Sequence, residues 1–353
     1  MRLRPRPLAA AAALALSAGL AVGSAAPASA AVTPSRIAGP DRVGTAIAAA
    51  TPTFSGGRAA AVVLARQDTF ADSLAAAPLA SDRGGPLLLT PSDRLPDAVA
   101  RSIRDVLRAG GTVFLLGGQN ALSAQVESAV RALPGVGTVR RVAGADRYAT
   151  AVEVAKLLPG SSDVALVTGR NFPDGLSAGA LMGVVGAGSS RALGVVLLTD
   201  DGVVPAVTRD HLAQRRTPDS VVVAVGGQAV RAASAAGLPG VVPLAGNDRY
   251  ETSAAVAQLF ASNSYFEDST TVVGIATGEN WPDALAGSAL LAYGGGPLVL
   301  TARDGLPPAS ANALTALQRD ARGTGRPIAD ALVFGGPGVV SDNAVSQVAA
   351  ALR

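Results

Sequence analysis

Short, continuous runs of apolar residues recur along the chain, separated by turn residues and helical stretches. Runs of four to seven residues without polar alternation are typical of strands buried on both faces of a parallel sheet. Because helical stretches separate the runs, we expect right-handed crossovers and an α/β fold with mostly parallel sheets. The strands predicted in this way are 59–65, 87–90, 112–116, 138–142, 164–168, 195–199, 221–225, 271–277, 298–301 and 332–334.

Helical stretches fill the intervals between these strands. In the first third of the chain they are an Ala-rich stretch at 43–50, a small-residue stretch from 70 to about 80, and an amphipathic stretch at 95–108. Pro96 suits the first turn of the third stretch, and Ser123 is an expected N-cap for a fourth. The same order of elements then returns twice.

A short motif with an Asp-Arg pair, which we call the repeated phrase, occurs at the start of each copy of this order. Its three aspartates are 105 and 102 residues apart. The chain is therefore one module of about 100 residues written three times, with copies at 31–140, 141–242 and 243–353. The last strand of each copy runs almost directly into the next phrase. We therefore expect three tandem α/β sandwiches packed tightly around a pseudo-threefold axis. The phrases are Ala38-Gly39-Pro40-Asp41-Arg42, Ala143-Gly144-Ala145-Asp146-Arg147-Tyr148 and Ala245-Gly246-Asn247-Asp248-Arg249-Tyr250.

Residues 1–30 predict a secretory signal peptide. Three arginines precede an Ala/Leu-rich run at 8–22, and Ala28-Ser29-Ala30 is a small-residue cleavage site. The alternative is a retained membrane anchor, but the run is short for a span of roughly 20 apolar residues. No later run predicts a membrane span, so we expect an exported protein.

Removal of the leader changes the charge balance of the chain. The full chain has 29 Lys+Arg and 26 Asp+Glu, and the leader contributes three arginines and no acid. The exported chain is therefore neutral. No basic run with interleaved aromatic residues is present either, so nucleic acid is not an expected partner.

Residue types restrict the chemistry available to the chain. It has no cysteine, so no disulfide framework is possible. His211 is the single histidine, so a His/Cys zinc site is excluded and a Ser-His-Asp triad would depend on this one residue. Three Gly-Gly pairs follow predicted strands, but none completes a nucleotide-binding motif. We expect tight turns with close backbone approach at these pairs, and no cofactor. The pairs are Gly117-Gly118, Gly226-Gly227 and Gly335-Gly336.

Three aspartates form the first set of candidate binding residues. Asp72, Asp174 and Asp283 each follow an aromatic residue by two positions and begin a small-residue stretch. They could face a ligand at the carboxyl edge of a parallel sheet, where sites of such sheets lie. Alternatively, they could bond backbone amides at a helix start.

The arginines of the repeated phrase, Arg42, Arg147 and Arg249, form the second candidate set. As ligand-binding groups they would offer bidentate donors to phosphate or carboxylate. In a structural role, each would pair with a neighbouring copy across the seam, by which we mean the boundary between two adjacent copies. The preceding aspartate would cap a helix. Both roles are compatible with the spacing.

Four phrases in fixed order resemble the cell wall-binding repeat 2 family. The order is Arg-x-Ala-Gly-x-Asp-Arg, (Phe/Trp)-x-Asp-x-Leu, Pro-Leu-Leu-Leu-Thr and a strand ending in Gly-Gly, in three copies over about 36–353. The resemblance implies a Toprim-like α/β sandwich in each copy and a triangular pseudo-trimer. It also implies a surface protein of Gram-positive bacteria that attaches non-covalently to the wall, through an anionic polymer or peptidoglycan.

Copy one departs from the pattern of the other two. Val43 stands where Tyr148 and Tyr250 follow the Asp-Arg pair, and Ala71 stands where the other copies have proline. These differences predict unequal sites. We expect a wall-binding protein without catalysis. The alternatives are an N-acetylmuramoyl-L-alanine amidase acting on peptidoglycan, with which family members are often associated, and a self-assembling surface protein.

Overall fold

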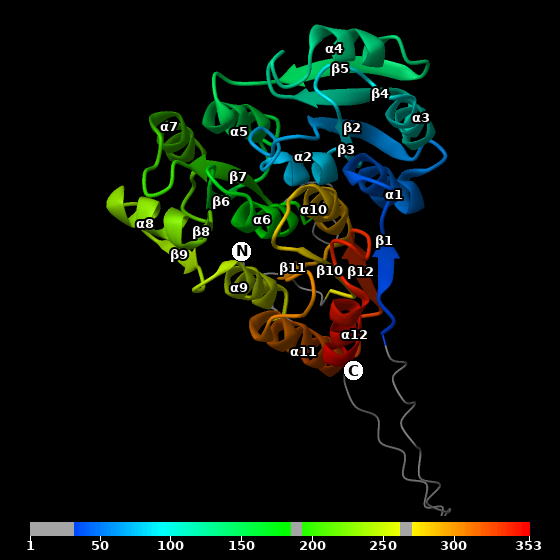
Figure 1. Cartoon of the computed structure of the whole chain (residues 1–353). Coiled ribbons are helices and arrows are strands. Elements are labelled where there is room, and N and C mark those ends of the chain that lie inside the picture. Colours follow the sequence, from blue (N-terminus) through cyan, green and yellow to red (C-terminus); the bar gives the residue numbers. More distant parts are fainter. Residues whose placement is uncertain (1–31, 185–192, 262–269) are drawn as a thin grey trace, which may run out of the picture. The chain divides into compact units, whose positions relative to one another are not determined.

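A computed structural model describes residues 32–184, 193–261 and 270–353 of the chain (Figure 1). The predicted signal peptide lies outside the described residues. Within them, twelve strands form three sheets of four parallel strands, which confirms the α/β prediction. The strands are β1 (Ser35–Ile37), β2 (Ala59–Arg66), β3 (Leu87–Thr90), β4 (Leu107–Leu116), β5 (Val136–Val142), β6 (Asp163–Thr168), β7 (Gly194–Thr199), β8 (Val222–Val225), β9 (Val241–Leu244), β10 (Val272–Thr277), β11 (Leu298–Thr301) and β12 (Asp330–Phe334).

The three sheets share one strand order, β3-β2-β4-β5, β7-β6-β8-β9 and β11-β10-β12-β1. The last strand of each order leads into an Asp-Arg phrase. In the third sheet this strand is β1, where Ser35 pairs with Leu332 and Ile37 with Phe334. The strand that precedes the first phrase therefore completes the sheet of the third copy. We call the three sheets, with α1–α4, α5–α8 and α9–α12 respectively, modules 1, 2 and 3.

Helices cover both faces of the sheets. Helices α1, α5 and α9 pack on β3, β7 and β11, and α2, α6 and α10 pack on β2, β6 and β10. Helix α3 ends two residues before the predicted Arg108, because β4 begins at Leu107. The helices are α1 (Arg42–Phe54), α2 (Ala76–Asp82), α3 (Asp97–Val106), α4 (Ala124–Arg131), α5 (Arg147–Lys156), α6 (Pro173–Met182), α7 (Ala206–Arg215), α8 (Gly227–Ala235), α9 (Arg249–Ala261), α10 (Pro282–Gly294), α11 (Pro308–Gly323) and α12 (Asp342–Ala351).

Helices α2, α6 and α10 contact one another in all three pairs (Figure 1). Their small residues allow this approach, since a Cβ added at Gly179 of α6 would lie 3.2 Å from Ala77 of α2 and 2.9 Å from Ser288 of α10. The Ser288 hydroxyl donates a buried hydrogen bond of 2.8 Å to the Leu176 carbonyl of α6. Three equivalent helices that each contact the other two are expected around a pseudo-threefold axis. This packing confirms that the modules pack tightly.

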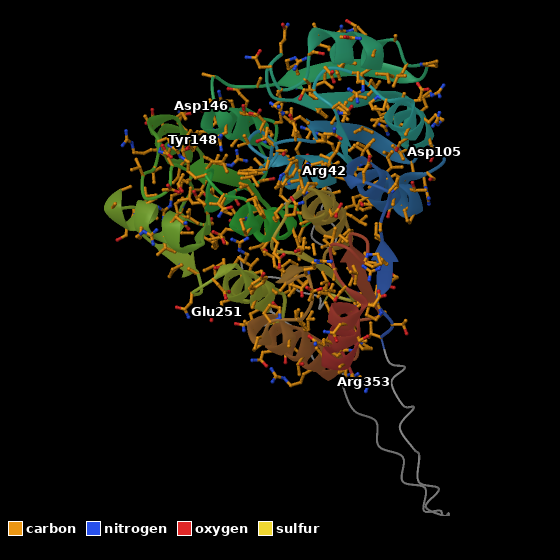
Figure 2. All side chains as sticks on the ribbon, in the orientation of Figure 1. Arg42, Asp105, Asp146, Tyr148, Glu251 and Arg353 are labelled. Atoms are coloured by element: carbon orange, nitrogen blue, oxygen red, sulfur yellow. The ribbon has the colours of Figure 1, made fainter. Side chains whose placement is uncertain are left out.

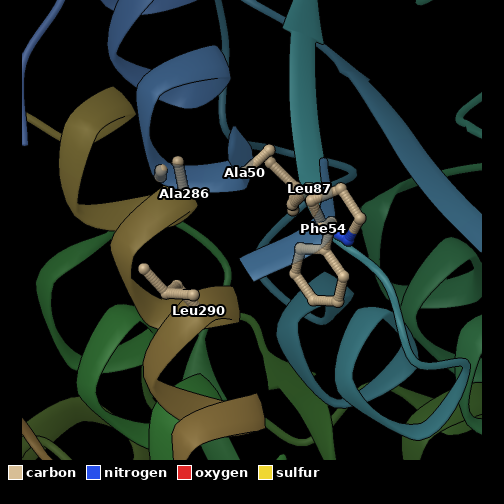
Figure 3. Close-up of a pocket in the computed structure, with 7 residues that line it drawn as sticks. Ala50, Phe54, Leu87, Ala286 and Leu290 are labelled. Carbon is tan, nitrogen blue, oxygen red and sulfur yellow. The ribbon is translucent and has the colours of Figure 1, made fainter. Parts of the chain in front are cut away.

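Modules 1 and 3 also meet through apolar side chains (Figure 3). Ala50 and Phe54 of α1 line a small void together with Leu87 of β3 and with Ala286 and Leu290 of α10. The void is too small to hold a water molecule. A dry apolar contact of this kind is stabilised by about 25 cal/mol per Å² of apolar surface removed from water.

Helix α2 starts later than its sequence indicates. We predicted a helix from residue 70, but α2 begins at Ala76, whereas α6 and α10 begin at Pro173 and Pro282. Proline at the first helical position has its φ angle set for a helix, and module 1 has Ala71 at the equivalent position. Residues 71–75 of module 1 form turns instead.

Loss of the side chain that fastens β1 should destabilise the protein. Arg36 donates 2.8 and 2.9 Å hydrogen bonds to the carbonyls of Gly335 and Val340, and it pairs with Asp342 at 2.8 Å. Arg36→Ala leaves these groups unpaired, and we expect the free energy of unfolding to fall by about 1–3 kcal/mol. Chemical denaturation measures this change.

The matched control is Arg319→Ala, which removes an exposed ion pair with Asp320. An exposed pair contributes about 0–1 kcal/mol. Equal losses for the two variants would show that β1 does not hold module 3 to module 1.

Candidate functional site

The aspartate of each repeated phrase caps the helix that follows it. Asp41 accepts from the Gly44 amide at 2.7 Å, and Asp146 accepts from the Ala149 amide at 2.8 Å. Asp248 accepts from the amide of Glu251 at 2.8 Å. All three aspartates are exposed N-terminal residues. The predicted capping role is therefore confirmed.

A threonine four residues after each of these aspartates completes the turn. Its hydroxyl accepts from the amide of the phrase glycine at 3.1–3.2 Å in all three modules. The glycine is required because a Cβ at Gly144, for example, would lie 2.3 Å from the Cβ of Ala149. The threonines are Thr45, Thr150 and Thr252.

The phrase arginines make hydrogen bonds within their own modules. Each donates Nη1 to the carbonyl of the residue that follows β2, β6 or β10 in its own module. The prediction that these arginines pair with a neighbouring copy is therefore wrong for the hydrogen bond, because the nearest free carbonyls lie at the carboxyl edge of their own sheet. The donor–acceptor pairs are Arg42 with Gln67, Arg147 with Gly169, and Arg249 with Gly278.

Aromatic rings cross the seams instead. The guanidinium of Arg42 lies 6.0 Å from the ring centre of Trp281 of module 3, and that of Arg249 lies 5.9 Å from the ring centre of Phe172 of module 2. Phe70 of module 1 contacts both rings, at 5.7 Å to Phe172 and 6.3 Å to Trp281. The aromatic residues of the (Phe/Trp)-x-Asp-x-Leu motif therefore join all three modules. Two of these rings face the arginine of the Asp-Arg phrase in the next module.

The candidate aspartates lie against the Gly-Gly turns. The first glycine of each pair has a positive φ, of 87°, 88° and 106° for Gly117, Gly226 and Gly335. A Cβ at Gly226 would lie 1.9 Å from Oδ2 of Asp174, and the equivalent distances in modules 1 and 3 are 2.6 and 2.8 Å. Glycine is therefore needed both for the backbone angle and for the approach of the carboxylate. The predicted tight turn is confirmed.

Burial changes the acidity of two of these aspartates. It raises the pKa of Asp174 to about 6, and the charge of Arg249 opposes this shift. Burial also raises the pKa of Asp283, against a hydrogen bond from Thr45 and the charge of Arg42. In each case the opposing charge belongs to the next module, so the carboxylate and the phrase arginine influence each other across a seam.

These aspartates do not cap the helices near which they lie. In the described ranges, no backbone amide donates to Asp72, Asp174 or Asp283, and Oδ1 of Asp283 is buried without a hydrogen-bond partner. The prediction that they bond backbone amides therefore fails. The reason is their position in the helix. Pro173 and Pro282 are the first residues of α6 and α10, so Asp174 and Asp283 are the second residues and lie beyond the N-cap.

The seam between modules 1 and 2 holds an open cavity of about 460 Å³. Asp146, at the start of α5, lies on its module 2 side (Figure 2). The structure thus brings together Asp72 and Arg147, two of the predicted site residues, in one open space. The lining consists of Arg66, Ala71, Asp72, Gly118, Gln119, Asn120, Ala121, Gly144, Ala145, Asp146 and Arg147.

Two arginines for which the sequence predicted no role hold the strands that lead into the repeated phrases. Arg141 donates to the carbonyls of Gly117 and Gly118 at 2.8 and 3.0 Å, and it pairs with Glu127 at 2.8 Å. Arg36 makes the equivalent bonds in module 3. Both stand five residues before the phrase aspartate, and this fixed offset was the available signal.

Other chemistry is limited in the part of the chain that the structure describes. No group of three or more His, Cys, Asp or Glu side chains there is placed to hold a metal ion. No described helix is long and apolar enough to cross a membrane. His211 is half-buried on α7 beside Arg215, and burial lowers its pKa.

The seams, turns and repeated phrases have counterparts in known proteins. The chain belongs to the Cell wall binding domain 2 (CWB2) family, which it matches at residues 36–127, 141–235 and 244–345. It is therefore a cell wall-binding protein with three tandem copies of the family's domain.

Two curated relatives come from Bacillus subtilis (strain 168). N-acetylmuramoyl-L-alanine amidase LytC is 27% identical over 266 residues, which are 75% of this chain and 50% of the amidase. The amidase enhancer is 31% identical over 116 residues, which are 33% of this chain and 16% of the enhancer. The chain therefore spans half of the amidase and less of the enhancer.

Two solved structures share the fold. Cwp8 from Clostridium difficile has a TM-score of 0.74 at 23% identity, covering 91% of this chain and 52% of Cwp8. Cwp6 from the same organism has a TM-score of 0.73 at 19% identity, covering 91% of this chain and 48% of Cwp6. The arrangement of three parallel sheets is thus common to all three proteins.

The raised pKa of Asp174 predicts a pH-dependent stability. An unfolded aspartate has a pKa near 3.9, so the folded state binds the proton more tightly than the unfolded state. Below pH 4 both states are protonated and nothing is lost. As pH rises through about 6, the buried carboxylate ionises, and the free energy of unfolding falls by about 2–3 kcal/mol.

Asp174→Asn removes this titration. Its free energy of unfolding relative to the wild type should therefore rise by about 2–3 kcal/mol between pH 4 and pH 7, as measured by urea denaturation. The exposed Asp219→Asn is the control. A difference between Asp174→Asn and the wild type that stays constant with pH would contradict a buried carboxylate at the seam.

Proposed function

We propose that the protein is a non-catalytic, exported wall anchor that holds an anionic wall polymer at its inter-module seams. The observation that carries this proposal is the repetition of one arginine-bearing seam at the carboxyl edge of each sheet. Membership of the CWB2 family supports the wall as the target. The charged group of the polymer would be met by Arg42, Arg147 and Arg249.

Each of these arginines keeps donors that the fold does not use. Only Nη1 is engaged by a carbonyl in each case. Among the described residues, Nε and Nη2 of the three side chains have no hydrogen-bond partner. A guanidinium presents these two N–H groups in parallel, which matches the two oxygens of a phosphate or carboxylate. The single carbonyl bond orients the guanidinium and leaves this pair available.

Three sites on one frame suit a repetitive polymer. Once one seam holds a polymer chain, the next repeat unit binds from a high effective concentration rather than from solution. Weak individual contacts can then add up to stable attachment without a covalent bond. The half-buried Asp72, Asp174 and Asp283 complete the proposed sites, where their carboxylates can accept hydrogen bonds from polymer hydroxyl groups.

An amidase activity is the second candidate, and the similarity to LytC is the observation that favours it. That similarity covers half of the amidase. The two functions differ in what the protein releases from a wall, so one experiment separates them.

The test uses the purified protein with three preparations of Gram-positive wall: intact walls, walls stripped of anionic polymer, and bare peptidoglycan. We expect the protein to sediment with intact walls and to stay in solution with the other two, with no soluble muropeptides released. Undiminished sedimentation with bare peptidoglycan would contradict the polymer as ligand. Release of muropeptides would contradict the absence of catalysis.

A further inference from the structure

The seam between modules 1 and 2 differs from the other two in what covers its arginine. Arg42 and Arg249 each face an aromatic ring of the neighbouring module. Among the described residues, no ring lies over Arg147. Arg147 instead lines the cavity of about 460 Å³, a volume within the usual range of about 300–1,000 Å³ for small-ligand sites.

Two side-chain amides distinguish this cavity further. Gln119 and Asn120 follow the Gly-Gly turn of module 1, line the cavity and are exposed. In the part of the chain that the structure describes, neither side-chain amide has a hydrogen-bond partner. The equivalent pairs are Gln228-Ala229 in module 2 and Pro337-Gly338 in module 3. Module 1 alone therefore presents two adjacent amides at this position.

The charges around the cavity nearly balance. Arg66 is held by Asp68 through two hydrogen bonds of 2.6 Å. Arg147 shares the cavity with the carboxylates of Asp72 and Asp146. An anion placed here would be attracted by Arg147 and repelled by the two carboxylates, and this repulsion cancels much of the attraction.

Donors and acceptors instead lie side by side. Each amide offers both an N–H₂ donor and a carbonyl acceptor, the carboxylates accept, and Arg147 donates. A hydroxyl group both donates and accepts, so a ring that carries adjacent hydroxyl groups can use all of these partners at once. A phosphate or carboxylate can only accept and would leave the carboxylate of Asp72 without a hydrogen-bond donor.

We propose that the cavity between modules 1 and 2 binds an uncharged sugar ring of the wall glycan through its hydroxyl groups. This proposal rests on the proposed function of wall attachment. It assigns different parts of the wall polymer to different seams. Arg42 and Arg249 meet only the charged groups of the polymer, whereas the free donors of Arg147 serve the sugar hydroxyl groups as well. The cavity selects the sugar. Its binding is expected to depend little on salt, because no net charge is neutralised.

The test measures binding of two neutral or near-neutral probes by titration calorimetry. One probe is the oligosaccharide released when hydrofluoric acid removes phosphate from the wall polymer, and the other is N-acetylglucosamine, the uncharged sugar of the peptidoglycan disaccharide. The variants are Gln119→Ala/Asn120→Ala and, as the matched control, Gln228→Ala in module 2. All altered side chains are at least partly exposed, and circular dichroism checks that each variant folds.

We expect one probe to bind the wild type equally at 50 and 500 mM salt, which also identifies its source. The double variant should weaken that binding about tenfold, the effect of two lost hydrogen bonds, and Gln228→Ala should leave it unchanged. Failure of both probes to bind, or full binding by the double variant, overturns the proposal. If intact walls still retain the wild type in either case, wall attachment stands and only the sugar cavity fails.

Discussion

The structure depends on the contact of a half-buried carboxylate with a glycine turn of its own module, beside each seam between modules. Asp174 lies so close to Gly226 that any side chain there would collide with it, and the same is true in outline for the other two modules. Burial raises the pKa of Asp174 and of Asp283, and the charge of an arginine of the next module opposes each shift. Charged groups of neighbouring modules therefore influence each other at these two seams, where they could also serve a ligand.

This arrangement explains why three copies occur together. Each sheet is completed by the strand that leads into an Asp-Arg phrase, and β1 does this for module 3. The sheets are thus linked in a closed cycle, in which the first strand of the described chain pairs with the last. Helices α2, α6 and α10 are then free to contact one another through small residues. Removing one copy would leave an unpaired sheet edge and an exposed helix face.

Much of this fold could be predicted from the sequence, because continuous apolar runs and a triplicated phrase report buried parallel strands and repetition. The late start of α2 could not be predicted, because the sequence does not show how strongly Pro173 and Pro282 fix the start of α6 and α10. Ala71, which replaces this proline in module 1, is itself compatible with a helix. The partners of Arg42, Arg147 and Arg249 could not be predicted, because a guanidinium reaches carbonyls on either side of a seam. Gln119 and Asn120 were missed because they depart from the repeat rather than follow it.

The central claim is that a phrase arginine serves both the seam and the wall, and Arg147→Gln tests it most directly. The measurement is retention on polymer-bearing walls, made alongside the circular dichroism spectrum of the same preparation. The account predicts a folded variant that is retained several-fold less than the wild type. A folded variant retained as well as the wild type would contradict it, because the arginine would then serve the joint between modules alone.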